Sequence, residues 1–142
     1  MKLEAWQRGL DLFAMTFRLS TEVSDFKLKS QVRDAAQSVS ANIAEGYGRR
    51  SLPEYLQFLY YAKGSLAETL ARVIGLQNVK LISNDNFEAF DQLHYEVENK
   101  LLRLIESLET KRATNEWCDM LPAKNPLIQK SIDPAIRPVP PA

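Results

Sequence analysis

The chain has little of what marks secreted, membrane or metal-binding proteins. Its only cysteine, Cys118, cannot form an internal disulfide, which is typical of a reducing compartment such as the cytoplasm. It has one histidine and no run of about 18 apolar residues that could cross a membrane. Its first ten residues lack the apolar stretch of a secretory signal. We therefore expect a cytoplasmic protein without a membrane partner.

The chain also has a net charge of zero, because its 18 basic and 18 acidic residues cancel. Without a basic excess, any binding of nucleic acid must come from a local patch. Residues 27–50 carry five basic and two acidic side chains, a net charge of +3. Residues 85–109 carry two basic and seven acidic side chains, a net charge of −5. The two segments indicate either solvated helix faces of opposite sign or a cationic surface that meets a partner.

Proline is almost absent from the first 112 residues, where only Pro53 occurs, and six prolines fall in the last 30 residues. Because proline removes a backbone donor and clashes with the preceding turn, the end of the chain cannot hold a long helix. We expect one domain over residues 1–112 and a proline-rich tail over 113–142, extended or partly disordered.

Before the tail, apolar residues recur at spacings of three and four, which predicts four amphipathic helices. We expect the first helix to start at residue 4 and the second at residue 26, after a cap at Ser24 or Asp25. The third should start at the capping box of Ser51 with Glu54, and "SNDN" at 83–86 should cap the fourth. No segment alternates with the period of a strand. The fold class is therefore all-α, an antiparallel up-down-up-down four-helix bundle with a proline-rich C-terminal tail.

Polar and small residues form one line on the second expected helix and one on the third. We interpret them as a structural polar seam, in which buried hydrogen bonds cross-link two tightly packed helices and Gly64 permits close approach. The alternative is a catalytic or metal-binding carboxylate pair, Glu45 with Glu68, but neither line holds a histidine or the Glu-x-x-His motif of di-metal bundles. The seam residues are Gln31, Ser38, Asn42, Glu45, Gly46 and Glu68.

Three further features could carry chemistry, and each has a structural explanation that we favour. "GYG" at 46–48 follows a helix and lacks the Lys-Ser/Thr ending of a phosphate loop, so we interpret Gly46 or Gly48 as a left-handed helix cap. His94 occupies a core position, where we expect a hydrogen bond to a carboxylate rather than a metal. Cys118 has no neighbouring base. We expect no catalytic residue, cofactor or metal.

The segment "QVRDAAQSVSANIAEGYGRRSLPEYLQFLYYAKGSLAE" resembles the signature of the four-helix-bundle family of 23S rRNA intervening-sequence proteins. The resemblance covers about residues 3–110. Asp34 departs from the family pattern where a second arginine is usual, and Ser40 where proline is usual. The matching residues include Trp6, Gln31, Arg33, Ser38, Asn42, Ile43, Glu45, Gly46, Arg49, Glu54, Phe58, Gly64, Ser65 and Glu68.

The resemblance implies a cytosolic, non-enzymatic protein that assembles into a homopentameric ring. Related family members are accessory factors of diversity-generating retroelements, in which the ring binds a reverse transcriptase and nucleic acid. The leading hypothesis is thus an oligomer that binds RNA or a ribonucleoprotein. The alternative is a scaffold or adaptor ring that binds a protein and no nucleic acid. The side chains expected to contact nucleic acid are Arg33, Arg49, Arg50, Lys63 and Arg72.

Overall fold

The structure is a computed structural model that describes residues 3–114. This part of the chain forms four helices and no strand: α1 (Glu4–Leu19), α2 (Phe26–Tyr47), α3 (Leu52–Asn78) and α4 (Asn84–Thr114). The prediction of an all-α fold is confirmed. Residues 113 and 114 of the predicted tail (113–142) belong to α4, and the rest of the tail, with Cys118, lies outside the described residues.

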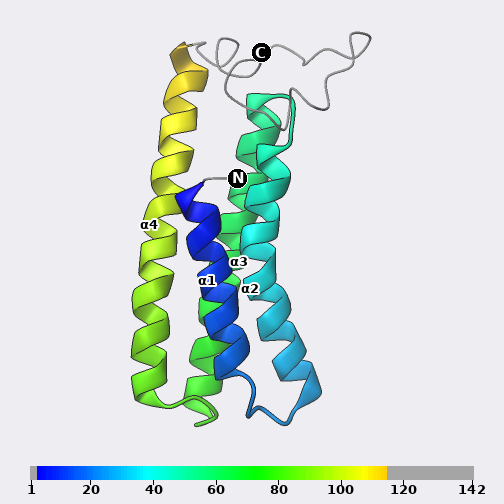
Figure 1. The fold of residues 1–142 in the computed structure, drawn as a ribbon, viewed down its shortest axis with the longest axis vertical. Coiled ribbons are helices and arrows are strands. Elements are labelled where there is room, and N and C mark those ends of the chain that lie inside the picture. The colour runs from blue at the N-terminus through cyan, green and yellow to red at the C-terminus, as the bar shows by residue number, and fades with distance from the viewer. Residues whose placement is uncertain (1–2, 115–142) are drawn as a thin grey trace.

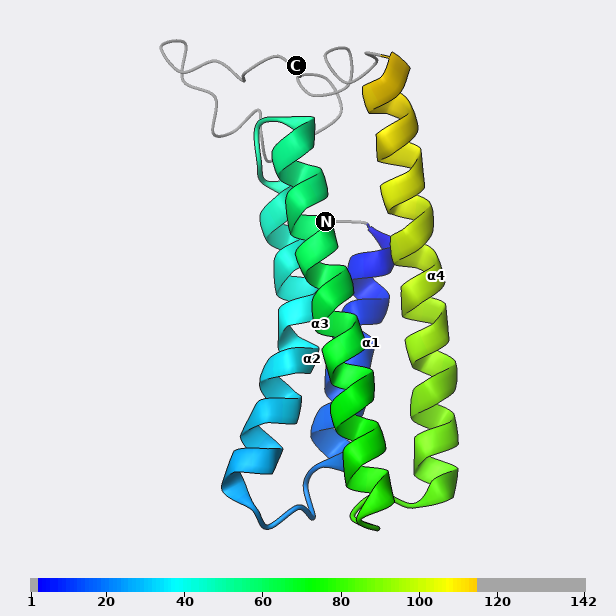
Figure 2. The same cartoon turned by 180° about the vertical axis from the view of Figure 1, so that it is seen from behind.

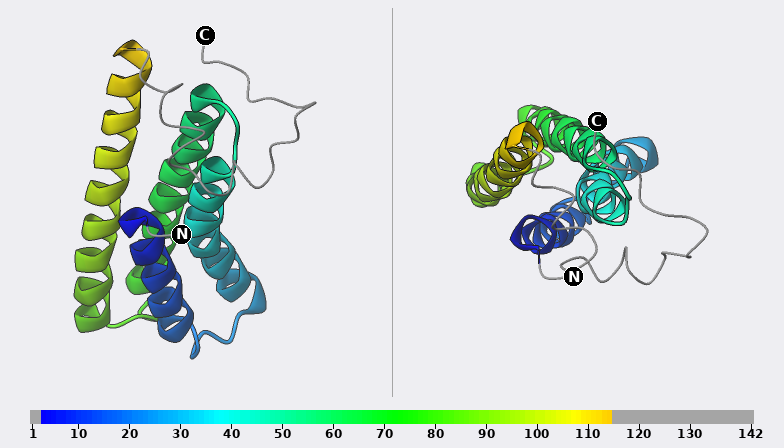
Figure 3. Two further views of the ribbon diagram at one scale, coloured as in Figure 1. Left: turned by 45° about the horizontal axis from the view of Figure 1, so that its top comes forward. Right: turned by 90° about the horizontal axis from the view of Figure 1, so that it is seen from above.

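The helices stand side by side as a bundle in which each one packs against two neighbours. Contacts join α1 to α2, α2 to α3, α3 to α4 and α4 to α1, so α2 lies diagonally across from α4 (Figure 3). Consecutive helices run in opposite directions, and both the α1–α2 and the α3–α4 links lie at the lower end (Figures 1 and 2). The net positive and net negative segments of the sequence therefore occupy opposite corners of the bundle.

The apolar stripes predicted for α2, α3 and α4 form most of the core, whereas in α1 the stripe residues Leu10 and Phe17 are 40% and 47% exposed and Ala5 and Leu12 are buried instead. Fully buried side chains come from every helix, for example Leu12 of α1, Ile43 of α2, Leu59 of α3 and Phe90 of α4. Burying a large aliphatic or aromatic side chain contributes about 1.5–3 kcal/mol relative to leaving it exposed. The amphipathic stripes, rather than helix propensity alone, therefore stabilise the bundle.

The helix starts agree with the predicted caps. The Asp25 side chain accepts a hydrogen bond from the backbone of Leu28 at 2.9 Å. The Ser51 hydroxyl accepts one from the backbone of Glu54 at 3.3 Å and donates to the Glu54 carboxylate at 3.2 Å. Ser83 caps α4 in the same way. Each cap satisfies an amide that the helix leaves unpaired, which contributes about 1 kcal/mol.

The expected left-handed glycine at the end of α2 is wrong. Gly48 has φ −82° and ψ −2°, and no glycine among the described residues has a positive φ. The chain turns instead through tight hydrogen bonds, such as that from the Arg49 amide to the Gly46 carbonyl at 3.0 Å. The left-handed residue is Lys80, with φ 65°. It ends α3 in a Schellman motif, since the Leu81 amide bonds the Leu76 carbonyl at 2.9 Å.

Candidate functional site

Arg33, one of the five side chains expected to contact nucleic acid, instead closes the C-terminal end of α1. Its Nε donates to the Ser20 hydroxyl at 2.8 Å, and its Nη2 donates to the Phe17 carbonyl at 3.0 Å. Its guanidinium also lies 3.6 Å from the centre of the Phe17 ring. These contacts satisfy a carbonyl that the helix end leaves unpaired and place a cation at the negative end of the helix dipole. Arg33 has a structural role.

Arg49 is held against the bundle at the opposite end. Its Nη2 lies 2.6 Å from the Glu45 carboxylate, and its guanidinium lies 4.6 Å from the centre of the Phe58 ring. Within the described residues its Nε is buried and makes no hydrogen bond. An arginine stacked on an aromatic ring and paired with a carboxylate has less of its charge available for a phosphate.

Arg72 joins α3 to α2. Its Nε lies 2.8 Å from the Glu68 carboxylate, and its Nη1 donates to the Gln31 side chain at 3.1 Å. Arg50 is half-buried and Lys63 is exposed, and neither forms a hydrogen bond or ion pair in the described part of the chain. The five nominated cations thus do not converge on one surface, and only Arg50 and Lys63 are unengaged.

Of the residues in the expected polar seam, Gln31 bonds a side chain of α3, whereas Ser38 and Asn42 bond their own helix. Asn42 donates to the Ser38 carbonyl at 2.8 Å within its own helix, and Ser38 likewise donates to the Asp34 carbonyl at 2.9 Å. Gln31 and Arg72 form a side-chain hydrogen bond between α2 and α3. Because these residues flank the core stripe, their polar ends reach solvent or their own helix. The expected set of buried hydrogen bonds between the helices is therefore wrong.

The two carboxylates of the alternative interpretation do not form a pair. Glu45 and Glu68 are both about half exposed, and each binds the arginine four residues later in the chain. Glu45 lies in the last turn of α2, whereas Glu68 binds Arg72, which bonds Gln31 in the first half of α2. Within residues 3–114 no group of three or more histidine, cysteine, aspartate or glutamate side chains could hold a metal ion.

Close packing of α2 on α3 occurs at Gly46 and not at the predicted Gly64. A methyl group added to Gly46 would lie 2.9 Å from the Cβ of Phe58 and 3.1 Å from the Tyr55 carbonyl oxygen. Gly64 is exposed, and an added methyl group would meet nothing within 4 Å. The signal for Gly46 was present in the sequence, because it lies three residues after Ile43 and so continues the core stripe of α2.

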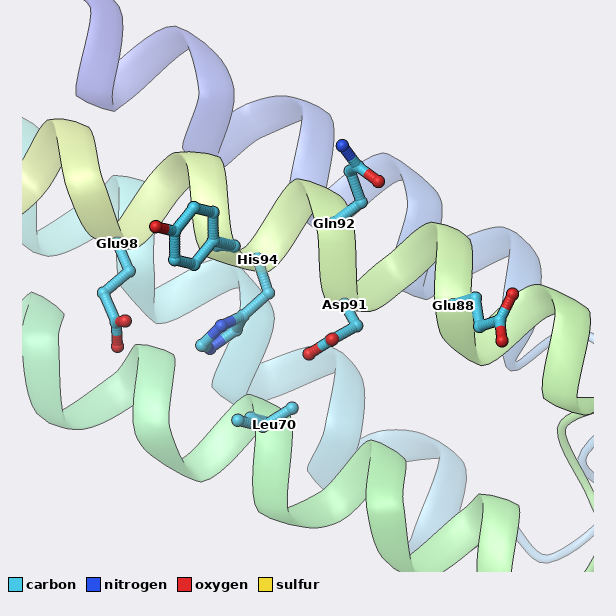
Figure 4. A pocket seen from close by; sticks show the side chains of 7 residues that line it. Leu70, Glu88, Asp91, Gln92, His94 and Glu98 are labelled. Atoms are coloured by element: carbon cyan, nitrogen blue, oxygen red, sulfur yellow. The ribbon is translucent and has the colours of Figure 1, made fainter.

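His94 is buried, but its hydrogen-bond partner differs from the expected one. Its Nε2 lies 2.8 Å from the Leu66 carbonyl oxygen of α3 rather than from a carboxylate. A carbonyl only accepts, so Nε2 carries the proton and donates. The side chains of Asp91 and Glu98 flank His94 in an open pocket of about 520 Å³ between α3 and α4 (Figure 4). His94 therefore ties α4 to α3 beneath an acidic surface.

Two surfaces were missed by the sequence reasoning. An apolar groove of about 500 Å³ lies between the start of α2 and the end of α3. At the other end of the bundle, Lys111 and Arg112 in the last turn of α4 lie at the same end as Arg50. The cations had a signal in the sequence, since basic residues favour helix C-termini. The groove had none, because it depends on how two helices diverge.

No helix in the described residues is long and apolar enough to span a membrane. Residues 1–103 match the sequence model of a family described as 23S rRNA-intervening sequence protein. The fold is similar to a crystal structure from Bacteroides thetaiotaomicron VPI-5482, described as a protein with unknown function from the S23 ribosomal protein family. The two chains are 19% identical over 71% of this chain and 97% of the other, with a TM-score of 0.66. No curated protein matches this chain.

Proposed function

Because the chain belongs to the family of 23S rRNA-intervening sequence proteins, we propose that it is a non-enzymatic, homo-oligomeric accessory protein that binds RNA or a ribonucleoprotein. The family resemblance favours a pentameric ring in the cytoplasm. Five chains of 16.2 kDa would give a particle of about 81 kDa. Light scattering on the purified full chain tests this assembly, and a stable monomer at micromolar concentration would refute it.

The observation that carries RNA binding is a set of free cations at one end of the bundle. Arg50 follows α2, and Lys111 and Arg112 end α4; no ion pair neutralises them within the described residues. The Tyr60 hydroxyl donates a hydrogen bond to Glu109, which joins α3 to α4 at this end. Phosphate oxygens bind such unengaged side chains without regard to base sequence. In a ring, every copy would add the same set, and the contacts would act together.

The test is a double variant that removes two positive charges, Arg50→Gln with Arg112→Gln. The matched control is Arg18→Gln with Lys29→Gln, which removes two cations from the opposite end of the bundle, in the last turn of α1 and near the start of α2. We expect the test variant to bind single-stranded RNA more weakly and with a shallower salt dependence. Removing one phosphate-binding side chain lowers the log–log slope by about 0.7 to 0.9. An equally large effect in the control would show that bulk charge is responsible and not this end of the bundle.

The second candidate is a scaffold or adaptor ring that binds a protein and no nucleic acid. It is favoured by the internal contacts of Arg33, Arg49 and Arg72, which remove three of five cations from any phosphate surface. The two functions differ at low salt, where electrostatic binding is strongest. If the wild-type chain binds no RNA at about 50 mM salt, the scaffold function replaces RNA binding.

A further inference from the structure

We propose that the apolar groove between α2 and α3 of one copy receives the acidic surface around Tyr95 on α4 of a second copy. The two surfaces differ, so copies would join head to tail. This inference rests on the homo-oligomeric part of the proposed function and names the surfaces that would make the assembly. It does not depend on RNA binding.

The groove is apolar at its floor and open to solvent. Val32 and Leu76 form buried parts of its lining, whereas Val79 is 63% exposed and Leu28 is 40% exposed. Gly75 and Ala71 lie along its α3 wall and leave room for a large side chain, since a methyl group added to Gly75 would meet nothing within 4 Å. Such an exposed apolar hollow on an otherwise polar helix pair is typical of an interaction site.

The Tyr95 surface consists of Tyr95 with Glu88, Asp91 and Glu98, all on α4. Tyr95 is 64% exposed, although an aromatic ring gains free energy when it is buried. The three carboxylates line the same pocket as Tyr95 and make no ion pair within the described residues. An exposed tyrosine surrounded by carboxylates matches the form of an interface anchor with a charged rim.

The charges of the two surfaces are complementary. Arg72 on α3 lines the groove, and Lys27 immediately precedes the groove residue Leu28 in the chain. Lys80 follows the end of α3 beside the groove residue Val79. Glu68 is the one acid in the groove lining, and Arg72 already binds it. A cationic border would attract the carboxylates around Tyr95 and would repel a second groove, which favours unlike surfaces.

The positions of the two surfaces favour a closed ring over a filament. They lie on neighbouring sides of the bundle, because one is between α2 and α3 and the other is between α3 and α4 (Figure 3). They also lie at the same height, since the adjacent α3 residues Leu70 and Ala71 line the acidic pocket and the groove. Because the two surfaces differ and lie on neighbouring sides, each head-to-tail contact turns one copy relative to the last, and such contacts form a ring when the rotation closes.

The test fills the groove with Gly75→Trp and removes the anchor with Tyr95→Ala. Gly64→Trp is the matched control for the first, because Gly64 is also an exposed α3 glycine with nothing within 4 Å of an added methyl group. Tyr61→Ala is the control for the second, since Tyr61 is a 50% exposed tyrosine on α3. Analytical ultracentrifugation at one protein concentration gives the mass, and circular dichroism shows that each variant is helical.

We expect both test variants to sediment as monomers and both controls to keep the wild-type mass. Mixing Gly75→Trp with Tyr95→Ala in equal amounts should give dimers of about twice 16.2 kDa, because each partner keeps one intact surface. If the wild-type mass is multimeric but both test variants keep it, this interface is wrong while the proposed assembly stands. If the wild type is a monomer, both are wrong. If one test variant fails to fold, the other and its control still decide between these outcomes.

Discussion

Gly46→Ala should destabilise the bundle, although alanine is the better helix former. In the last turn of α2, the added methyl group would lie 2.9 Å from the Phe58 Cβ, 3.0 Å from a Tyr55 ring carbon and 3.1 Å from the Tyr55 carbonyl oxygen. One of these atoms is a backbone oxygen and another is a Cβ, so rotamer changes cannot move them away. α2 and α3 must therefore separate at this point.

The expected change in the free energy of unfolding is the sum of two opposing contributions. Overpacking a well-packed site costs about 1–3 kcal/mol. The helix-propensity gain from glycine to alanine is at most about 1 kcal/mol and is smaller in a last turn. We expect a net loss of about 1–2 kcal/mol for Gly46→Ala. Gly64→Ala has the propensity gain without the steric conflict, so it should be stabilised by up to about 1 kcal/mol.

Urea unfolding followed by circular dichroism, at one protein concentration for all three chains, measures the difference. At an m-value of about 2 kcal/mol/M, a loss of about 2 kcal/mol lowers the midpoint by about 1 M. A fixed concentration matters because assembly would add to apparent stability. If Gly46→Ala unfolds at the same urea concentration as Gly64→Ala, then α2 and α3 do not meet tightly at Gly46, and the packing argument fails.

Three other substitutions test the structural roles. Arg33→Lys should lower the free energy of unfolding by about 1–3 kcal/mol, because an ammonium cannot bond Ser20 and Phe17 together and stack on the Phe17 ring; unchanged urea stability would return Arg33 to the candidate phosphate-binding residues. Burial raises the pKa of the Tyr55 hydroxyl, so above about pH 10 the unfolded chain loses a proton that the folded chain keeps, and stability should fall as pH rises. Tyr55→Phe should show a smaller decline than wild type between about pH 9 and about pH 10.5, and equal declines would contradict this role. His94→Ala should lower the free energy of unfolding by about 2–4 kcal/mol, because it removes the hydrogen bond to Leu66 and leaves a cavity beside Phe90. A chelator should not change the melting temperature of the wild type, and destabilisation by the chelator would indicate a metal at His94.

Local signals explain why the helices could be predicted and their side-chain contacts could not. The Ser51–Glu54 cap involves residues three apart, so their spacing alone predicts the bond. Arg33 and Ser20 are 13 residues apart, and Arg72 and Gln31 are 41 apart, so their partners depend on how the helices are placed. The sequence nominated these arginines for nucleic acid but could not show these internal partners, for this reason. Sequence spacing does not show which partner lies within reach.

The sequence itself determined family membership, the four helices, their starts and the opposed charges of α2 and α4. Periodicity, caps and charge counts are local properties, so they can be seen without the tertiary structure. The tertiary structure alone decided that Gly46 and not Gly64 is the close contact. It also decided that His94 bonds a backbone carbonyl and that a groove opens between α2 and α3 beside the acidic surface of α4. These features arise where side chains from different helices meet. Their distances depend on helix positions and crossing, which no single helix specifies.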